Sequence, residues 1–193
     1  MSLSFRVLEG HEPDTERDQS FEEYVRQEII RYGQEGQKLT ELSYGFGERS
    51  LQLEVTPGLQ DIPVLRSLCF WYLQEVQIPE ELASNLVLAF EEAIANILRH
   101  SYQEGNIPWV RVVMAVESNS LSLRFEDRGE GGRNPGLVEA LEAISQEGRP
   151  RLRRRGGLGL YLMKRMMTEM TYKPGEPVNC LLLRKDWEST STS

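Results

Sequence analysis

One long apolar stripe, followed by two alternating strand segments, most constrains the fold of this chain. From Pro79 to about Tyr102, apolar residues recur every three or four positions, as on one face of an α-helix. The segments Trp109–Val116 and Leu121–Phe125 then alternate apolar and polar residues around a polar turn at 118–120, the pattern of a β-hairpin. A helix with one apolar face must be covered, so these patterns predict a helix layer packed on a sheet.

Further segments extend both layers. Strands are predicted at Ser50–Val55 and Val178–Arg184, and helices at Asp61–Val76, at 137–144 and from Leu158 to about Met170. The fold class is therefore α+β, a two-layer sandwich in which helices cover one face of a mostly antiparallel or mixed sheet.

The chain divides into three predicted parts. Residues 1–45 form an N-terminal extension with one amphipathic helix, residues 46–187 form a single globular domain, and residues 188–193 form a disordered tail. In the extension, Phe21, Val25 and Ile29 share a helix face, and Ser20 with Glu23 makes a possible capping box. A lone apolar stripe needs a partner surface, so this helix is expected either to dock on the domain or to form a dimer contact.

Composition excludes several classes of protein. The 193 residues hold 22 Lys and Arg against 30 Asp and Glu, giving a net charge of -8, which disfavours a general nucleic-acid binder. We expect a cytoplasmic protein, because no apolar run is long enough to span a membrane and no signal peptide is evident. Seven arginines are nevertheless gathered between Arg128 and Arg155, which suggests a local anionic ligand.

Three motifs could carry chemistry. Glu92 and Asn96 lie one turn apart at the border of the apolar helix face, where they could hold a metal ion and a water, or be an ordinary solvated stripe. Asp127 ends a predicted strand and is followed by Gly129 and Gly131, so the backbone can approach a ligand closely. The sequence Gly156-Gly157-Leu158-Gly159 opens a helix, where backbone N–H groups suit a phosphate. The alternative for both glycine motifs is a plain turn or helix start.

The order and spacing of the three motifs resemble the GHKL ATPase superfamily, whose ATP site is the Bergerat fold. The segment Glu92–His100 is most similar to the N box of bacterial anti-sigma-factor serine kinases, Glu-Ala-x-x-Asn-Ala-x-x-His. The resemblance covers about Arg49 to Lys185. The chain departs from the family at Val178-Asn179, where Gly-Thr is usual, and at residues 132–135 after the first glycine box.

The resemblance implies a role for each matching residue. Asn96 would hold Mg²⁺, Glu92 would be the general base, and Asp127 would accept a hydrogen bond from the exocyclic amine of adenine. Residues 132–156 would be a mobile lid over ATP, with Arg155 as its basic catalytic residue. The glycine motifs would shape the base pocket and line the phosphates, through Gly129, Gly131, Gly157, Leu158 and Gly159.

The resemblance also implies a function. The chain would be an ATP- and Mg²⁺-dependent protein serine kinase and anti-sigma factor, a homodimer that phosphorylates a small antagonist protein and binds a sigma factor in competition with it. The alternative is an ATP-binding regulatory module that binds protein partners without phosphorylating them. Glu92 favours the kinase, because a pure binder has less need of a base.

Overall fold

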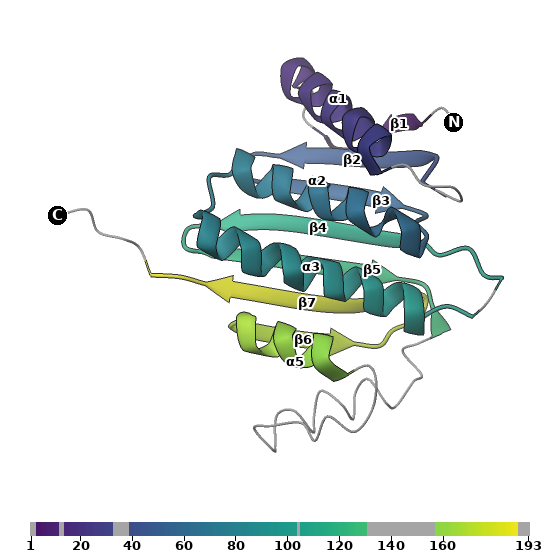
Figure 1. The fold of residues 1–193 in the computed structure, drawn as a ribbon, viewed down its shortest axis with the longest axis vertical. Coiled ribbons are helices and arrows are strands. Elements are labelled where there is room, and N and C mark those ends of the chain that lie inside the picture. The colour runs from purple at the N-terminus through teal and green to yellow at the C-terminus, as the bar shows by residue number, and fades with distance from the viewer. Residues whose placement is uncertain (1–2, 12–13, 33–38, 104, 131–156, 189–193) are drawn as a thin grey trace.

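A seven-stranded sheet carries helices on one face, which confirms the predicted two-layer α+β fold (Figure 1). The computed structural model describes residues 3–11, 14–32, 39–103, 105–130 and 157–188. The strand order is β1-β2-β3-β4-β5-β7-β6; β1 runs parallel to β2, and the other neighbouring strands are antiparallel. In chain order the elements are β1 (Ser4–Val7), α1 (Thr15–Tyr32), β2 (Glu41–Gly47), β3 (Ser50–Val55), a 3₁₀ turn (Leu59–Asp61), α2 (Ile62–Glu75), α3 (Glu80–His100), β4 (Val110–Glu117), β5 (Ser120–Asp127), α5 (Gly157–Met166), β6 (Glu169–Lys173) and β7 (Asn179–Asp186).

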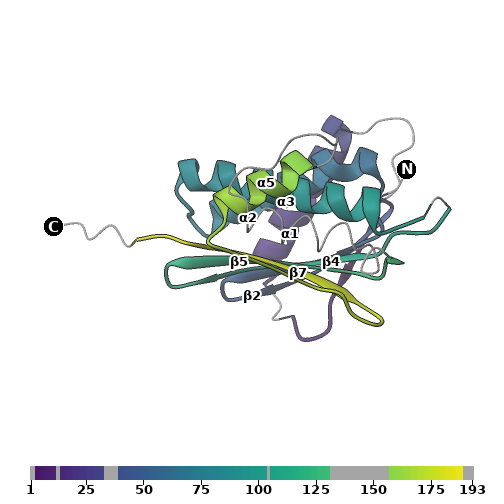
Figure 2. The same cartoon turned by 90° about the horizontal axis from the view of Figure 1, so that it is seen from below.

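The predicted stripe and hairpin form the centre of the core. Figure 2 shows the sheet nearly edge-on, with α2, α3 and α5 on the same side of it. Alternate residues of β4 and β5 are buried, and α3 covers them with Leu86, Phe90, Ala93 and Ile97, while Leu82 is only half-buried. The rings of Phe90 and Phe125 pack with their centroids 5.5 Å apart. This contact fixes α3 over β5, whose last residue belongs to the candidate site.

Helix α1 docks on the same domain, which is one of the two placements expected for its apolar face. Phe21 and Val25 are fully buried, and the ring of Phe21 packs against those of Tyr44, Phe46 and Trp71 at centroid distances of 5.0, 5.4 and 5.1 Å. The helix therefore packs on β2, next to the edge strand β1, and on α2 (Figure 1).

The start of α1 differs from the prediction. The helix begins at Thr15, and the side chain of Asp14 accepts the N–H of Arg17 at 3.1 Å, so the proposed capping box at Ser20 and Glu23 lies inside the helix and is wrong. Four residues before that start, the buried ring of His11 contacts the Asp18 carboxylate, with Nε2 3.0 Å from Oδ1. Local propensity allows this earlier start, because Glu16, Arg17 and Gln19 are good helix formers.

We expect Val25→Ala to lower the free energy of unfolding by about 2 kcal/mol, because two buried methyl groups are lost and a cavity remains. Ile30→Ala on the same helix is the control: its side chain is 83% exposed, so the change should stay within about 0.5 kcal/mol. Chemical denaturation measures both. Equal effects would mean that α1 does not pack on the domain in solution.

Three strands were missing from the prediction, and one predicted helix was too long. Helix α5 ends at Met166, and Glu169–Lys173 forms the edge strand β6 where the helix was expected to continue to Met170. Strand β1 lies within the predicted N-terminal extension, residues 1–45, and β2 crosses the predicted boundary at its end. Among the described residues, no helix has both the length and the apolar content to cross a membrane.

Candidate functional site

Helix α3 presents Glu92 and Asn96 at one edge of its buried face. Their neighbours Ala93 and Ile97 are buried in the core, whereas Glu92 and Asn96 are half-buried. The third residue of the predicted polar stripe, Arg99, is exposed and separate from this edge. The Asn96 side-chain nitrogen is shielded from solvent and has no hydrogen-bond partner in the described part of the chain. A buried amide without a partner is costly, so this position is suited to a ligand.

The first turn of α5 lies directly against Glu92. A Cβ atom on Gly159 would overlap a carboxylate oxygen of Glu92, so a side chain there would displace the flexible end of Glu92. The first N–H groups of a helix have no partner within the helix and carry its positive dipole end. Helix α5 begins at Gly157, so this end is placed beside the Glu92 carboxylate. The structure thus brings together two motifs that lie 65 residues apart in the sequence.

Asp127 forms the opposite end of the site. It is the last residue of β5 and only 3% exposed, and its Oδ1 accepts the N–H of Gly129 at 2.8 Å and the side-chain amide of Asn179 at 3.1 Å. Burial raises the pKa of this carboxyl, and the hydrogen bonds from Asn179, Gly129 and Ser101 oppose that rise. The three donors hold the carboxylate in one orientation, because each satisfies a lone pair that burial removed from water.

Asn179 is a site residue that sequence reasoning missed. Asn179 stands where the GHKL ATPases that the sequence resembles usually have Thr, and no role was predicted for it from the sequence. Its amide nitrogen donates to Asp127 and, at 2.8 Å, to the carbonyl of Gly129, while its oxygen accepts the N–H of Gly175 at 3.3 Å. One buried side chain therefore ties the end of β5 to the β6–β7 turn. The register Asp127↔Asn179 between β5 and β7 could have indicated it, but only after the strand order was known.

The end of α3 packs on the turn after Asp127. A Cβ atom on Gly129 would overlap the backbone carbonyl of Ser101, so a side chain there would push the turn away from the helix. The next residue, Tyr102, joins three backbone groups: its hydroxyl donates to the carbonyl of Trp109 at 2.6 Å and accepts the N–H groups of Trp109 at 3.1 Å and Arg128 at 3.0 Å. Tyr102 thus positions the chain between Asp127 and Gly129.

Tyr102→Phe should lower the free energy of unfolding by about 1–3 kcal/mol, because the part-buried N–H of Trp109 and the more exposed N–H of Arg128 would lose their acceptor. Tyr24→Phe is the matched control, since the Tyr24 hydroxyl makes a long hydrogen bond, at 3.4 Å, to the carbonyl of Ser67. Equal melting temperatures for the two variants would contradict the positioning role of Tyr102.

Several predicted residues are not placed. Gly131, Arg155, the proposed lid over 132–156 and the short helix over 137–144 lie outside the described residues. Gly157 and Leu158 belong to the first turn of α5, the turn whose Gly159 contacts Glu92. The described residues contain no group of three or more His, Cys, Asp or Glu side chains suited to a metal ion. An Mg²⁺ ion here would depend on Asn96 together with phosphate oxygens and water, which are ligands that Mg²⁺ prefers.

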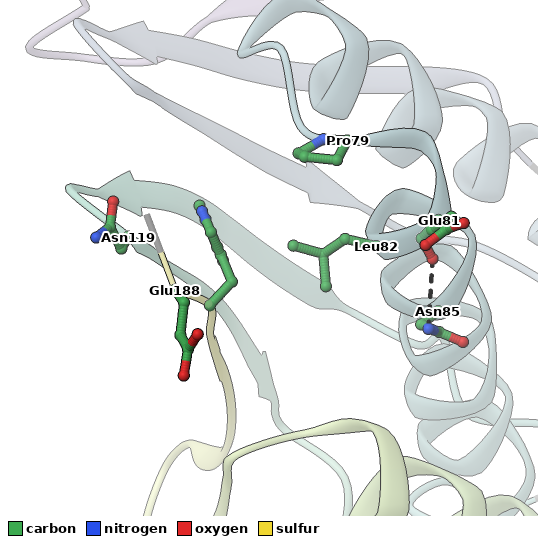
Figure 3. A pocket seen from close by; sticks show the side chains of 7 residues that line it. Pro79, Glu81, Leu82, Asn85, Asn119 and Glu188 are labelled. Carbon is green, nitrogen blue, oxygen red and sulfur yellow. Dashed lines mark hydrogen bonds between the residues drawn. The ribbon is translucent and has the colours of Figure 1, made fainter. Parts of the chain in front are cut away.

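Two open pockets lie at opposite ends of α3. One, of about 900 Å³, adjoins the Asp127 end and is lined by Arg128–Glu130, by Pro174–Pro177 and by Asn179. The other, of about 580 Å³, lies between the first turn of α3, the β4–β5 turn and the end of β7, as Figure 3 shows with Leu82 facing across toward Asn119 and Glu188. The second pocket contains none of the predicted site residues.

Comparison with known families agrees with this arrangement. A family model described as a histidine kinase-like ATPase domain matches residues 56–185, a span of 130 of the 193 residues. The span contains both motifs that meet at Glu92 and Gly159 as well as Asp127 and Asn179. A search of curated proteins finds no match.

Proposed function

Because this chain belongs to the histidine kinase-like ATPase family, we propose that it uses ATP to phosphorylate a serine of a small antagonist protein, and that it binds a sigma factor in competition with that protein. ATP binding is the property expected of the family. The serine specificity, the two partners and a homodimeric state are the further steps of the proposal.

The contact between Glu92 and Gly159 carries the proposal. In this contact a carboxylate lies beside the N-terminal turn of α5, and the N–H groups at a helix N-terminus suit a phosphate. A carboxylate is repelled by phosphate, so a site that only binds nucleotide gains nothing from it there. A base that accepts the proton of an attacking hydroxyl needs this location.

The residues of the chain divide the work along the site. Bound ATP would supply the γ-phosphoryl group, and Mg²⁺ would neutralise part of its charge. Asn96 fits that end because a side-chain amide offers an oxygen to a cation or a nitrogen to a phosphate oxygen. Glu92 would take the proton of the serine hydroxyl as its oxygen attacks phosphorus and ADP leaves. At the other end of the site, Asp127 would accept a hydrogen bond from the exocyclic amine of adenine.

The test is phosphotransfer from labelled ATP, with Mg²⁺, to candidate antagonist proteins, followed by identification of the modified residue. Label on one serine of one antagonist supports the kinase. Tight ATP binding without transfer to any candidate would favour the alternative, a regulatory module that binds partners without phosphorylating them. A chain that does not bind ATP would contradict both.

A further inference from the structure

Two buried side-chain atoms in the described part of the chain lack a hydrogen-bond partner: the amide nitrogen of Asn96 and the hydroxyl of Tyr172. The first belongs to the site described above. Four other tyrosine hydroxyls find a partner: Tyr24 with Ser67, Tyr44 with Glu22, Tyr72 with Arg49 and Tyr102 with Trp109. A buried hydroxyl without a partner is destabilising. The Tyr172 hydroxyl is therefore suited to form a hydrogen bond with an atom of a bound ligand.

The sheet places Tyr172 on the same side as Asp127. Tyr172 of β6 is opposite Leu181 of β7, and Asn179, two residues before Leu181, is opposite Asp127 of β5. Residues two apart on a strand share a face, and Leu181 and Asn179 are both buried beneath the helix layer. Tyr172 and Asp127 therefore lie diagonally on the face that the helices cover, on either side of β7.

The two groups also affect each other electrostatically. Burial, together with the negative charge of Asp127, raises the pKa of Tyr172 to about 12. The hydroxyl consequently keeps its proton at neutral pH and can act as a donor. Asp127 in its ionised form is an acceptor only, so the pair offers one acceptor and one donor.

We propose that the Tyr172 hydroxyl donates a hydrogen bond to a ring nitrogen of adenine next to the exocyclic amine, so that Tyr172 and Asp127 together select the base. This inference rests on the proposed ATP site. Adenine presents a donor amine beside acceptor ring nitrogens, which matches an acceptor carboxylate beside a donor hydroxyl. Guanine and hypoxanthine carry a carbonyl in place of the amine, so the carboxylate would face an acceptor.

The experiment combines one variant with two ATP analogues. Dissociation constants are measured for ATP, 1-deaza-ATP and 7-deaza-ATP, in which a ring nitrogen beside the amine is replaced by C–H. In the unmodified protein, one analogue should bind about 3- to 10-fold more weakly than ATP. Tyr172→Phe should weaken ATP binding by a similar factor, and the variant should no longer distinguish that analogue from ATP.

Stability separates this role from a structural one. Because the Tyr172 hydroxyl has no partner without ligand, Tyr172→Phe should leave the melting temperature of the ligand-free protein unchanged or raise it. Tyr102→Phe should lower it, and Tyr24→Phe serves as the binding control for loss of a distant hydroxyl.

The outcomes distinguish the two levels of inference. A protein that binds no ATP would overturn the ATP site and this role with it. ATP binding that is intact in Tyr172→Phe, with the same analogue preference as the unmodified protein, would overturn the role of Tyr172 and leave the proposed function standing.

Discussion

Replacing Glu92 by Gln is expected to lower phosphotransfer by about 10²–10⁴-fold while ATP affinity is kept. Glutamine has nearly the same shape, so it preserves the packing against Gly159, but it cannot accept a proton. Single-turnover transfer to the antagonist measures the first quantity, and equilibrium titration with ATP measures the second.

Glu91→Gln is the matched control for this change. Glu91 is the neighbouring residue of α3 and pairs with Arg66 of α2 at 3.5 Å, on a part-exposed surface where an ion pair contributes little. Phosphotransfer should therefore be unchanged. Full activity of Glu92→Gln would exclude the base role, and a parallel loss of ATP affinity would assign Glu92 to binding.

Asp127→Asn is expected to weaken ATP binding by about 10- to 100-fold, or roughly 1.5–3 kcal/mol. The new amide must use its oxygen to accept the N–H groups of Gly129 and Asn179, which turns its own NH₂ toward the base. A donor would then face the donor amine of adenine. Titration with ATP and ITP tests this, because the carbonyl of hypoxanthine accepts from that NH₂, so the preference for ATP over ITP should fall.

Glu126→Gln makes the same chemical change one residue earlier. Glu126 pairs with Arg111 at 3.2 Å and Arg124 at 3.3 Å, away from Asp127, so nucleotide affinity and selectivity should stay as they are. Equal ATP affinity in Asp127→Asn and the unmodified protein would remove Asp127 from the base pocket.

Local periodicity was sufficient to predict α3 and the β4–β5 hairpin, because their buried faces repeat at helix and strand spacing over many residues. It failed at β6, where the sequence Glu-Met-Thr-Tyr-Lys continues the methionine spacing of α5. That strand is stabilised by pairing with β7, which no local pattern encodes. The edge strand β1 was not predicted for the same reason: it is only four residues long and depends on pairing with β2.

The site residues that belong to a local motif could be predicted, and those that depend on strand order could not. Glu92, Asn96 and Asp127 were predicted because each stands within a short motif. Asn179 and Tyr172 were not, since their positions beside Asp127 depend on the order of β5, β7 and β6. Asn179 is 52 residues from the carboxylate that it orients. Such contacts become visible only when the strand order is known.

Helix α3 sets the distance between the two ends of the site. Its side chain at Glu92 faces Gly159, and Ser101, which directly follows its last residue, meets Gly129. The nine residue steps from Glu92 to Ser101 span about 13.5 Å at 1.5 Å per residue. One residue inserted between Glu92 and Ser101 would lengthen this part of the helix only slightly. It would, however, rotate Glu92 by about 100° about the helix axis relative to Ser101. The two ends of the site could then no longer face the same ligand, so this segment sets both the length and the phase of what the protein can hold.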